Sequence, residues 1–66
     1  MRNCVKQLRK QAGLRQEDLA KKMGVTRQTI IAIENDKYDA SLALAMRLAR
    51  YLQTTVEDLF QLEDTP

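Results

Sequence analysis

Apolar residues recur at helical spacing along almost the whole chain, and short polar stretches interrupt them. With only two glycines and one proline, the sequence has few of the turn signals that separate strands. The pattern therefore predicts an all-α fold with five helices. We expect them over about Asn3–Ala12, Gln16–Met23, from an N-cap at Thr26 to Asn35, from an N-cap at Ser41 to Leu52, and Val56–Phe60.

Glycine and hydroxyl side chains mark the expected ends of these helices. Gly13 and Gly24 suit the left-handed backbone conformation in which many helices stop. Thr26, Ser41 and Thr55 precede the third, fourth and fifth helices, where a hydroxyl oxygen can accept a hydrogen bond from a free backbone N–H. Their positions support the proposed boundaries.

The pattern also predicts which helix faces are buried. The first helix has a narrow apolar stripe made of Cys4, Val5, Leu8 and Ala12. The fourth is apolar on nearly every side, so we expect it to be central and packed on several sides, leaving mainly Arg47, Arg50 and Tyr51 for solvent. Its expected buried residues are Leu42, Ala43, Leu44, Ala45, Met46, Leu48, Ala49 and Leu52.

The residues from Phe60 onward have two interpretations. Residues 61–66 either fray, or residues 60–63 pair as a strand with the first residues of the chain, which would give a short two-stranded sheet joining the termini. The acidic residues near this end fit helix capping and tail solubility better than metal binding, because no glycine-centred calcium loop accompanies them. These residues are Glu57, Asp58, Glu63 and Asp64.

Length and composition limit the classes of function. The 66 residues make a single domain, over 1–66. One cysteine and no histidine exclude an intrachain disulfide and the familiar zinc clusters, so we expect a reducing, cytoplasmic setting and treat Cys4 as a small apolar residue or an idle thiol. We expect no membrane segment, no metal and no cofactor. We also expect no enzymatic activity, since a phosphate loop and a nucleophile with its base are both missing.

The charge is unevenly distributed along the chain. The formal net charge is only +2, but residues 2–37 carry nine basic and four acidic side chains, while residues 38–66 are net acidic. A basic half is what a nucleic-acid partner requires, because its phosphates attract cations. The first half is therefore the candidate nucleic-acid face.

Residues 16–35 have the spacing of two helices joined by a tight turn. The small side chain of Ala20 lets the second helix approach the third, Gly24 permits the turn, and Ile30 and Ile33 return to the core one helical turn apart. Arg27, Gln28 and Ile31 then share the opposite face. Arginine can pair with guanine, glutamine with adenine, and an isoleucine or threonine methyl can contact thymine in the major groove.

These residues carry a resemblance to a known family. The chain is similar to the phage-repressor-like (XRE-type) helix-turn-helix regulators, which include the lambdoid repressors and Cro. The resemblance covers nearly the whole chain and is most specific at Gln16, Ala20, Gly24, Val25, Thr26, Gln28, Thr29, Ile30, Ile33, Glu34 and Asn35, with support from Leu14 and from the segments 37–38 and 58–60. The length and the tetrad 27–30 look most like the small subgroup of the cytolysin-operon repressor, a five-helix dimer with a short terminal sheet.

The resemblance implies roles for individual residues. Gln16 matches a glutamine that binds DNA phosphate and braces the recognition helix, and Asn35, Lys37 and Tyr38 match a loop that grips the DNA backbone. Tyr38 is also open to a packing role in which its ring lies on the core. The recognition-helix positions, with Gln28 the expected base reader, are Thr26, Arg27, Gln28, Thr29 and Ile31.

Two residues depart from the family pattern. Arg15 replaces the usual serine or threonine N-cap of the second helix, at a cost of about 1 kcal/mol unless another group takes over the capping, and it is open to an added phosphate contact. Ala40 replaces the proline that commonly precedes the fourth helix, which loosens the loop but touches no proposed contact.

The sequence thus predicts a lambda-repressor-like regulator, with double-stranded DNA as its partner, that represses transcription from a palindromic operator as a homodimer. The expected dimer surface is Thr54, Thr55, Val56, Leu59, Phe60 and Leu62. The alternative is an antitoxin or another protein-interaction module that keeps the fold and uses its surface for protein contact.

Overall fold

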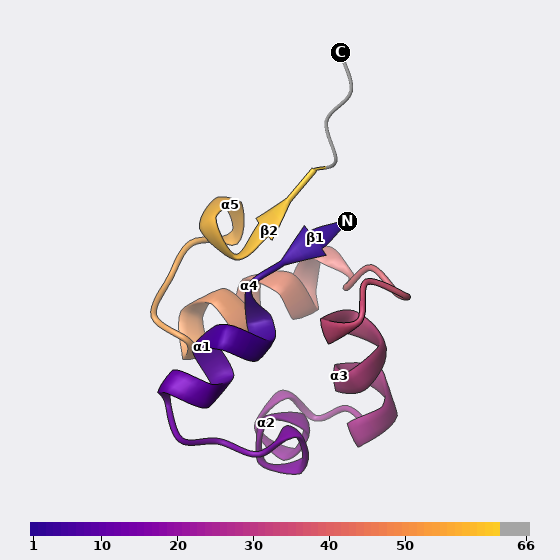
Figure 1. Ribbon diagram of the computed structural model, residues 1–66, viewed down its shortest axis with the longest axis vertical. Helices are drawn as coiled ribbons and strands as arrows, with labels where there is room; N and C mark the ends of the chain where they lie inside the picture. The colour runs from indigo at the N-terminus through magenta and orange to yellow at the C-terminus, as the bar shows by residue number, and fades with distance from the viewer. Residues whose placement is uncertain (63–66) are drawn as a thin grey trace.

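The computed structural model describes residues 1–62, and it consists of five helices with a short sheet that joins the two ends of this segment (Figure 1). The all-α prediction is confirmed. The helices are α1 (Val5–Gln11), α2 (Gln16–Met23), α3 (Arg27–Glu34), α4 (Leu42–Tyr51) and α5 (Val56–Leu59). The strands are β1 (Arg2–Asn3) and β2 (Phe60–Gln61).

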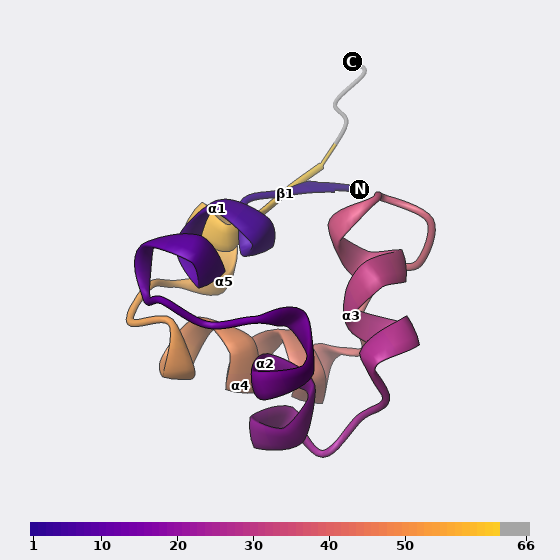
Figure 2. The same cartoon turned by 60° about the horizontal axis from the view of Figure 1, so that its bottom comes forward.

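The core lies between the helices and takes residues from every one of them. Figure 2 shows α1 and α5 on one side of the molecule, α2 and α4 below them, and α3 standing at the opposite edge. Leu19, Ile30, Ile33 and Leu48 are completely buried, so the two helices of the predicted pair and the central helix share one apolar interior. The buried apolar residues are Val5, Leu19, Ala20, Met23, Ile30, Ile33, Leu44, Ala45, Leu48, Ala49, Leu59 and Phe60.

The three predicted N-caps are present. The hydroxyl oxygen of Thr26 accepts from the backbone N–H of Thr29 at 3.4 Å, and that of Ser41 accepts from Leu44 at 3.2 Å. Thr55 caps α5 by accepting from Asp58 at 3.0 Å. Each bond satisfies one backbone donor that the helix itself leaves unpaired.

Each of the four longer helices ends in a left-handed residue, and only half of these residues are glycines. Gly13 after α1 and Gly24 after α2 have φ of 74° and 73°, as predicted. Asp36 after α3 and Gln53 after α4 have φ of 58° and 59°, and neither was predicted. For a residue with a Cβ this conformation costs roughly 1–2 kcal/mol, less for Asp, so the surroundings must hold both in place.

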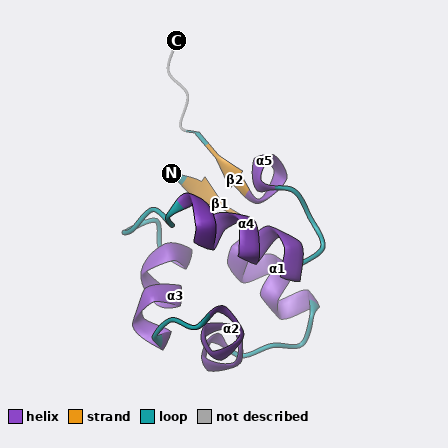
Figure 3. Ribbon diagram, turned by 180° about the vertical axis from the view of Figure 1, so that it is seen from behind, coloured by secondary structure: helices purple, strands orange, loops and turns teal. Residues whose placement is uncertain are grey.

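The sheet joins the N-terminal and C-terminal ends of the described segment, which decides between the two interpretations of the C-terminal residues. β1 and β2 pair antiparallel, with Arg2 opposite Gln61 and Asn3 opposite Phe60. They lie at the end of the molecule away from α2 (Figure 3). Consequently α1 begins at Val5, two residues later than predicted, while the predicted roles of Glu63 and Asp64 fall outside the described residues.

Two predictions about burial are wrong. Leu42 and Met46 of α4 are 72% and 51% exposed and Ala43 is exposed as well, so this helix buries one face and leaves an apolar strip in solvent. Ala12, which lies just after α1, is exposed, and within α1 Arg9 is buried instead. The periodicity of apolar residues missed Arg9 because a buried cation is stable only with a partner, and here the partner is distant in sequence.

A membrane-spanning helix and a metal site each place requirements on the described residues. No helix within residues 1–62 is long and apolar enough to cross a membrane. In the same segment, no three side chains among His, Cys, Asp and Glu are grouped so that they could hold a metal ion.

Candidate nucleic-acid interface

The outward face of α3 is the strongest candidate for contact with DNA. In Figure 1, α2 is seen nearly end-on while α3 runs across the view, so the two helices cross steeply. Ile30 and Ile33 are fully buried, which fixes the rotation of α3 about its own axis. Arg27 and Gln28 are therefore exposed and Ile31 is half-exposed, as the helical spacing predicts.

The N-terminal end of α3 is stiffened by a pair of threonines. Besides its capping bond, the hydroxyl of Thr26 lies 3.1 Å from the hydroxyl of Thr29, so the two share a hydrogen bond. Thr26 is exposed and Thr29 half-buried. Both are at the same end of the helix as Arg27 and Gln28, so the residues expected to read bases start from an ordered first turn.

A buried ion pair joins α1 to the C-terminal end of α3. Arg9 Nε donates to Glu34 Oε2 at 2.7 Å and Arg9 Nη2 donates to Glu34 Oε1 at 3.2 Å, with side-chain exposures of 8% and 2%. Arg9 Nη1 also donates to the carbonyl oxygen of Leu14 at 2.8 Å. The pattern of apolar residues gives no sign of this pair, because its members are 25 positions apart, although Glu34 is one of the residues that carry the family resemblance.

Gln16 extends this network to the surface. Its side-chain Nε2 donates to Glu34 Oε1 at 3.1 Å, so the amide lies against the end of α3. An amide nitrogen carries two hydrogens, and one bond to Glu34 leaves the second available. Gln16 is thus in contact with α3, and its role at DNA phosphate stays a prediction.

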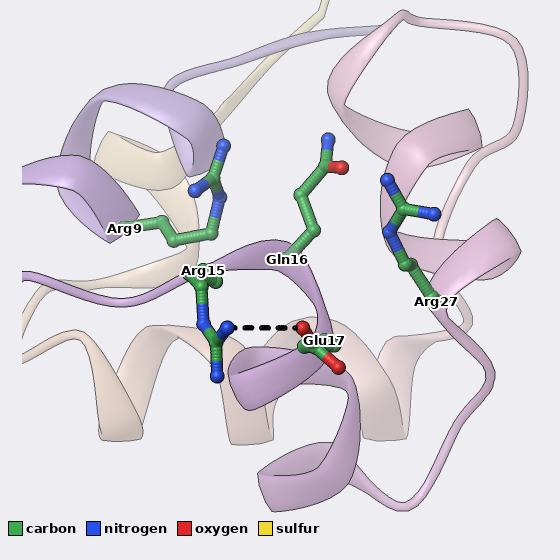
Figure 4. Close-up of a pocket in the computed structure, with 5 residues that line it drawn as sticks. All are labelled: Arg9, Arg15, Gln16, Glu17 and Arg27. Carbon is green, nitrogen blue, oxygen red and sulfur yellow. Dashed lines mark ion pairs between the residues drawn. The ribbon is translucent and has the colours of Figure 1, made fainter.

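Gln16 also lies in an open depression in the surface (Figure 4). The depression has a volume of about 500 Å³, and it is lined by Arg9, Arg15, Gln16, Glu17 and Arg27. The side chains of Gln16 and Arg27 extend into the space between α2 and α3 from opposite sides. Arg9 is already paired with Glu34, and Arg15 with Glu17 and Asp18, so the exposed Arg27 is the lining arginine best placed to attract an anion such as a phosphate.

The missing N-cap of α2 is partly replaced by the helix itself. Asp18 Oδ2 accepts from the backbone N–H of Arg15 at 2.9 Å and from its Nε at 3.3 Å. The backbone bond, followed by the guanidinium, lowers the pKa of Asp18 below its ordinary value. Arg15 Nη1 also lies 3.4 Å from Glu17 Oε1. The pKa of Arg15 is raised, mainly by its side-chain hydrogen bond to Asp18.

The loop after α3 presents the remaining predicted backbone contacts. Asn35, Lys37 and Tyr38 are all exposed, at the end of α3 that lies away from Arg27. Tyr38 is 51% exposed and does not belong to the core cluster, so the packing role considered for its ring is not seen. The loop and the N-terminal turn of α3 thus lie at either end of the outward ridge.

The expected dimer surface needs a correction. Leu59 is completely buried and Phe60 is 9% exposed, because both anchor the C-terminal elements to the protomer's own core. Of the other four residues, Thr54 and Val56 are half-buried, and Thr55 and Leu62 are exposed. Thr54, Thr55 and Val56 line a shallow groove of about 300 Å³ together with Met46, Ala49 and Arg50.

Comparison with known proteins identifies relatives over nearly the full chain. The family model described as helix-turn-helix matches residues 5–59. An uncharacterized HTH-type transcriptional regulator of Methanocaldococcus jannaschii is 55% identical over 64 residues, which is 97% of each chain. One from Methanothermobacter thermautotrophicus is 51% identical, covering 97% of this chain and 94% of its own. The regulator YgzD of Bacillus subtilis is 45% identical, covering 97% of both chains.

Proposed function

The chain belongs to the helix-turn-helix family of DNA-binding transcriptional regulators, and on that basis we propose that it represses transcription by binding a palindromic operator as a homodimer. The observation that carries this proposal is the outward ridge of α3. Its polar residues are free of core contacts, while its apolar face and the Arg9–Glu34 pair hold the helix in one orientation. A rigid, exposed helix face is what insertion into a major groove requires.

Base reading is assigned to the first two turns of α3. Gln28 pairs through its amide with adenine, and Arg27 donates two hydrogen bonds to guanine. Ile31 and the methyl group of Thr29 contact thymine methyl groups. Thr26 contributes from the end of the helix that enters the groove first.

Phosphate contacts are assigned to both ends of the ridge. The second amide hydrogen of Gln16 donates to one phosphate in the depression beside Arg27, and Asn35, Lys37 and Tyr38 bind the backbone on the other side. Such contacts fix register and supply affinity, but they carry no sequence information.

The homodimer is proposed from size and from the uncovered apolar surface. A domain of this length buries only about 60% of the surface of its unfolded chain, so a second copy adds stability. Thr54, Thr55, Val56 and Leu62, with the groove beside Met46, are the surface assigned to it. Two recognition helices would then enter successive major grooves about 34 Å apart, which makes the operator two-fold symmetric. The terminal sheet also supports the likeness to the cytolysin-operon repressor subgroup.

Selection of bound duplexes from a random pool tests this function. We expect a two-fold consensus whose half-sites are one helical turn apart, and affinity that falls steeply as salt increases. Gln28→Ala should reduce the preference for the selected duplex over random duplex, whereas Lys37→Ala should weaken binding to both equally. A pool without any consensus would contradict sequence-specific binding, and a consensus without symmetry would contradict the palindrome.

Repression is tested by placing the selected sequence over a promoter. A bound dimer occupies DNA that RNA polymerase needs, so transcription in a purified system should fall as the protein is added. The same promoter with a scrambled site is the control. Increased transcription from the intact site would assign activation instead.

One observation favours the alternative of a protein-interaction module. Leu42 and Met46 form an exposed apolar strip on α4, and solvent-facing Arg47 and Arg50 lie beside it. Sedimentation at micromolar concentration discriminates between the two uses of this region, because a clean monomer would leave the strip for another protein and contradict the homodimer.

A further inference from the structure

Asn3 uses every polar atom of its side chain to join three parts of the fold. Its Nδ2 donates to the carbonyl oxygen of Ile33 at 2.8 Å and to Asp36 Oδ1 at 3.0 Å. Its Oδ1 accepts from the backbone N–H of Val5 at 3.0 Å. The first two bonds span 30 and 33 positions of sequence, so β1, the start of α1 and the end of α3 meet at this one side chain.

The two bonds to α3 act on its left-handed final turn. The backbone N–H of Asp36 donates to the carbonyl oxygen of Ile33 at 3.1 Å, and that of Lys37 donates to the carbonyl oxygen of Ala32 at 2.9 Å. This is the Schellman arrangement, in which glycine usually takes the left-handed position that Asp36 occupies with φ 58°. Asn3 binds both the carbonyl at the centre of this turn and the carboxylate of the residue in the unfavourable conformation.

The corresponding turn after α4 has no such tether. Gln53 takes the same left-handed position, and its backbone N–H and that of Thr54 make the equivalent bonds to Arg50 and Ala49. Yet among the hydrogen bonds of residues 1–62, none holds the side chain of Gln53. The tether is thus specific to the turn that leads into Lys37 and Tyr38.

The other side of the tether is itself fixed. Asn3 pairs with Phe60 in the sheet, and the backbone N–H of Cys4 donates to the carbonyl of Leu59 at 2.9 Å. Leu59 is fully buried, so the backbone that carries Asn3 is attached to the core. A displacement of the α3–α4 loop would therefore have to break bonds to a rigid support.

We propose that Asn3 is a positioning residue for DNA binding: it sets the path of the loop so that Lys37 and Tyr38 meet the DNA backbone, without touching DNA itself. The inference rests on the proposed function, which assigns those two residues to phosphate. It adds a residue of the N-terminal strand, outside the helix-turn-helix, to the set that determines affinity.

The substitution Asn3→Asp tests the proposal because it keeps the shape of the side chain. The new carboxylate still accepts from Val5, but it cannot donate to Ile33 and it repels Asp36. We expect affinity to fall about tenfold on the selected duplex and on random duplex alike, and the salt dependence to weaken by about one phosphate contact. Sequence preference should remain unchanged.

Three further variants separate positioning from general effects. Gln7→Glu makes the same amide-to-carboxylate change on exposed α1 and controls for the added negative charge. In a Lys37→Ala background, Asn3→Asp should weaken binding less than it does alone, because one of the two contacts it positions is already lost. Asp36→Asn combined with Asn3→Asp restores a donor and acceptor pair between positions 3 and 36 but not the bond to Ile33, so it should recover part of the affinity.

The results that overturn the proposal are distinct from those that overturn the function. If the unmodified protein selects a duplex but Asn3→Asp weakens binding no more than Gln7→Glu does, the positioning role is wrong. It is equally wrong if the losses of Asn3→Asp and Lys37→Ala multiply in full. If the unmodified protein selects no duplex at all, the proposed function fails, and the positioning role fails with it.

Discussion

The Arg9–Glu34 pair gives the most quantitative prediction about the support of the recognition helix. Glu34→Leu leaves the guanidinium of Arg9 buried, with the carbonyl oxygen of Leu14 as its only remaining partner in the network. Removing one member of a buried ion pair typically costs about 3–5 kcal/mol. A 66-residue domain has only about 3–10 kcal/mol of stability in total. We therefore expect Glu34→Leu to lose most of its stability and to melt at least about 12 °C lower.

The double variant Arg9→Met with Glu34→Leu isolates the interaction. With both charges replaced by apolar groups of similar size, no charge remains buried without a partner, and such replacements are often neutral. The carbonyl oxygen of Leu14 and the amide of Gln16 lose partners, so recovery should be incomplete. We expect the double variant to regain at least half of the stability that Glu34→Leu loses.

Urea unfolding followed by circular dichroism measures the stability of the unmodified protein, of Arg9→Met, of Glu34→Leu and of the double variant, which together form a double-mutant cycle. The coupling energy between the two substitutions should exceed about 2 kcal/mol. Two single losses under 1 kcal/mol each, adding in the double variant, would refute the view that the pair fixes α3. DNA affinity of the folded double variant should also fall, because Gln16 no longer has Glu34 to hold its amide.

Three other changes test separate features of the fold. Gln53→Gly should raise the unfolding free energy by about 0.5–1 kcal/mol in urea titrations, since glycine adopts the left-handed conformation without penalty; a loss would show that Gln53 is not strained. The carboxylate of Asp18 contributes a stabilisation that is fully present above the unfolded pKa of Asp and is lost as pH falls through the lower folded pKa. Asp18→Asn should remove this stabilisation, so acid unfolding curves that do not change would contradict the capping role. Leu59→Ala should cost about 2–5 kcal/mol because its side chain is fully buried, whereas a near-neutral effect would return Leu59 to the surface.

Local signals in the sequence predicted the helices well. The start of α2 at Gln16 and its end at Met23 follow from the turn glycine and the apolar period, and the three hydroxyl N-caps each bind the predicted turn. The exposed ridge of α3 also follows, because burying Ile30 and Ile33 leaves only one orientation for Arg27 and Gln28. Such features depend on residues within about one turn of each other.

The features that were missed depend on distant partners. From the sequence alone Arg9 is expected on the surface, because its buried partner Glu34 is distant in the chain. Asn3 is likewise expected in the first helix, because its pairing with β2 and its bond to the end of α3 depend on the fold. Asp36 and Gln53 have no sequence signature for a left-handed turn, which glycine would have given. Because α4 has apolar residues on every side, the sequence could not show which of them stay exposed, and these include Leu42 and Met46.

The central claim, that the outward face of α3 enters the groove of DNA, is tested most directly by mapping the interface in solution. Amide NMR spectra of the labelled protein should be compared with and without the duplex selected from the random pool. We expect the largest shifts at residues 26–31, with further shifts at Gln16 and along the loop at Lys37 and Tyr38. Shifts confined to α4 and α5, with Arg27 and Gln28 unchanged, would contradict it.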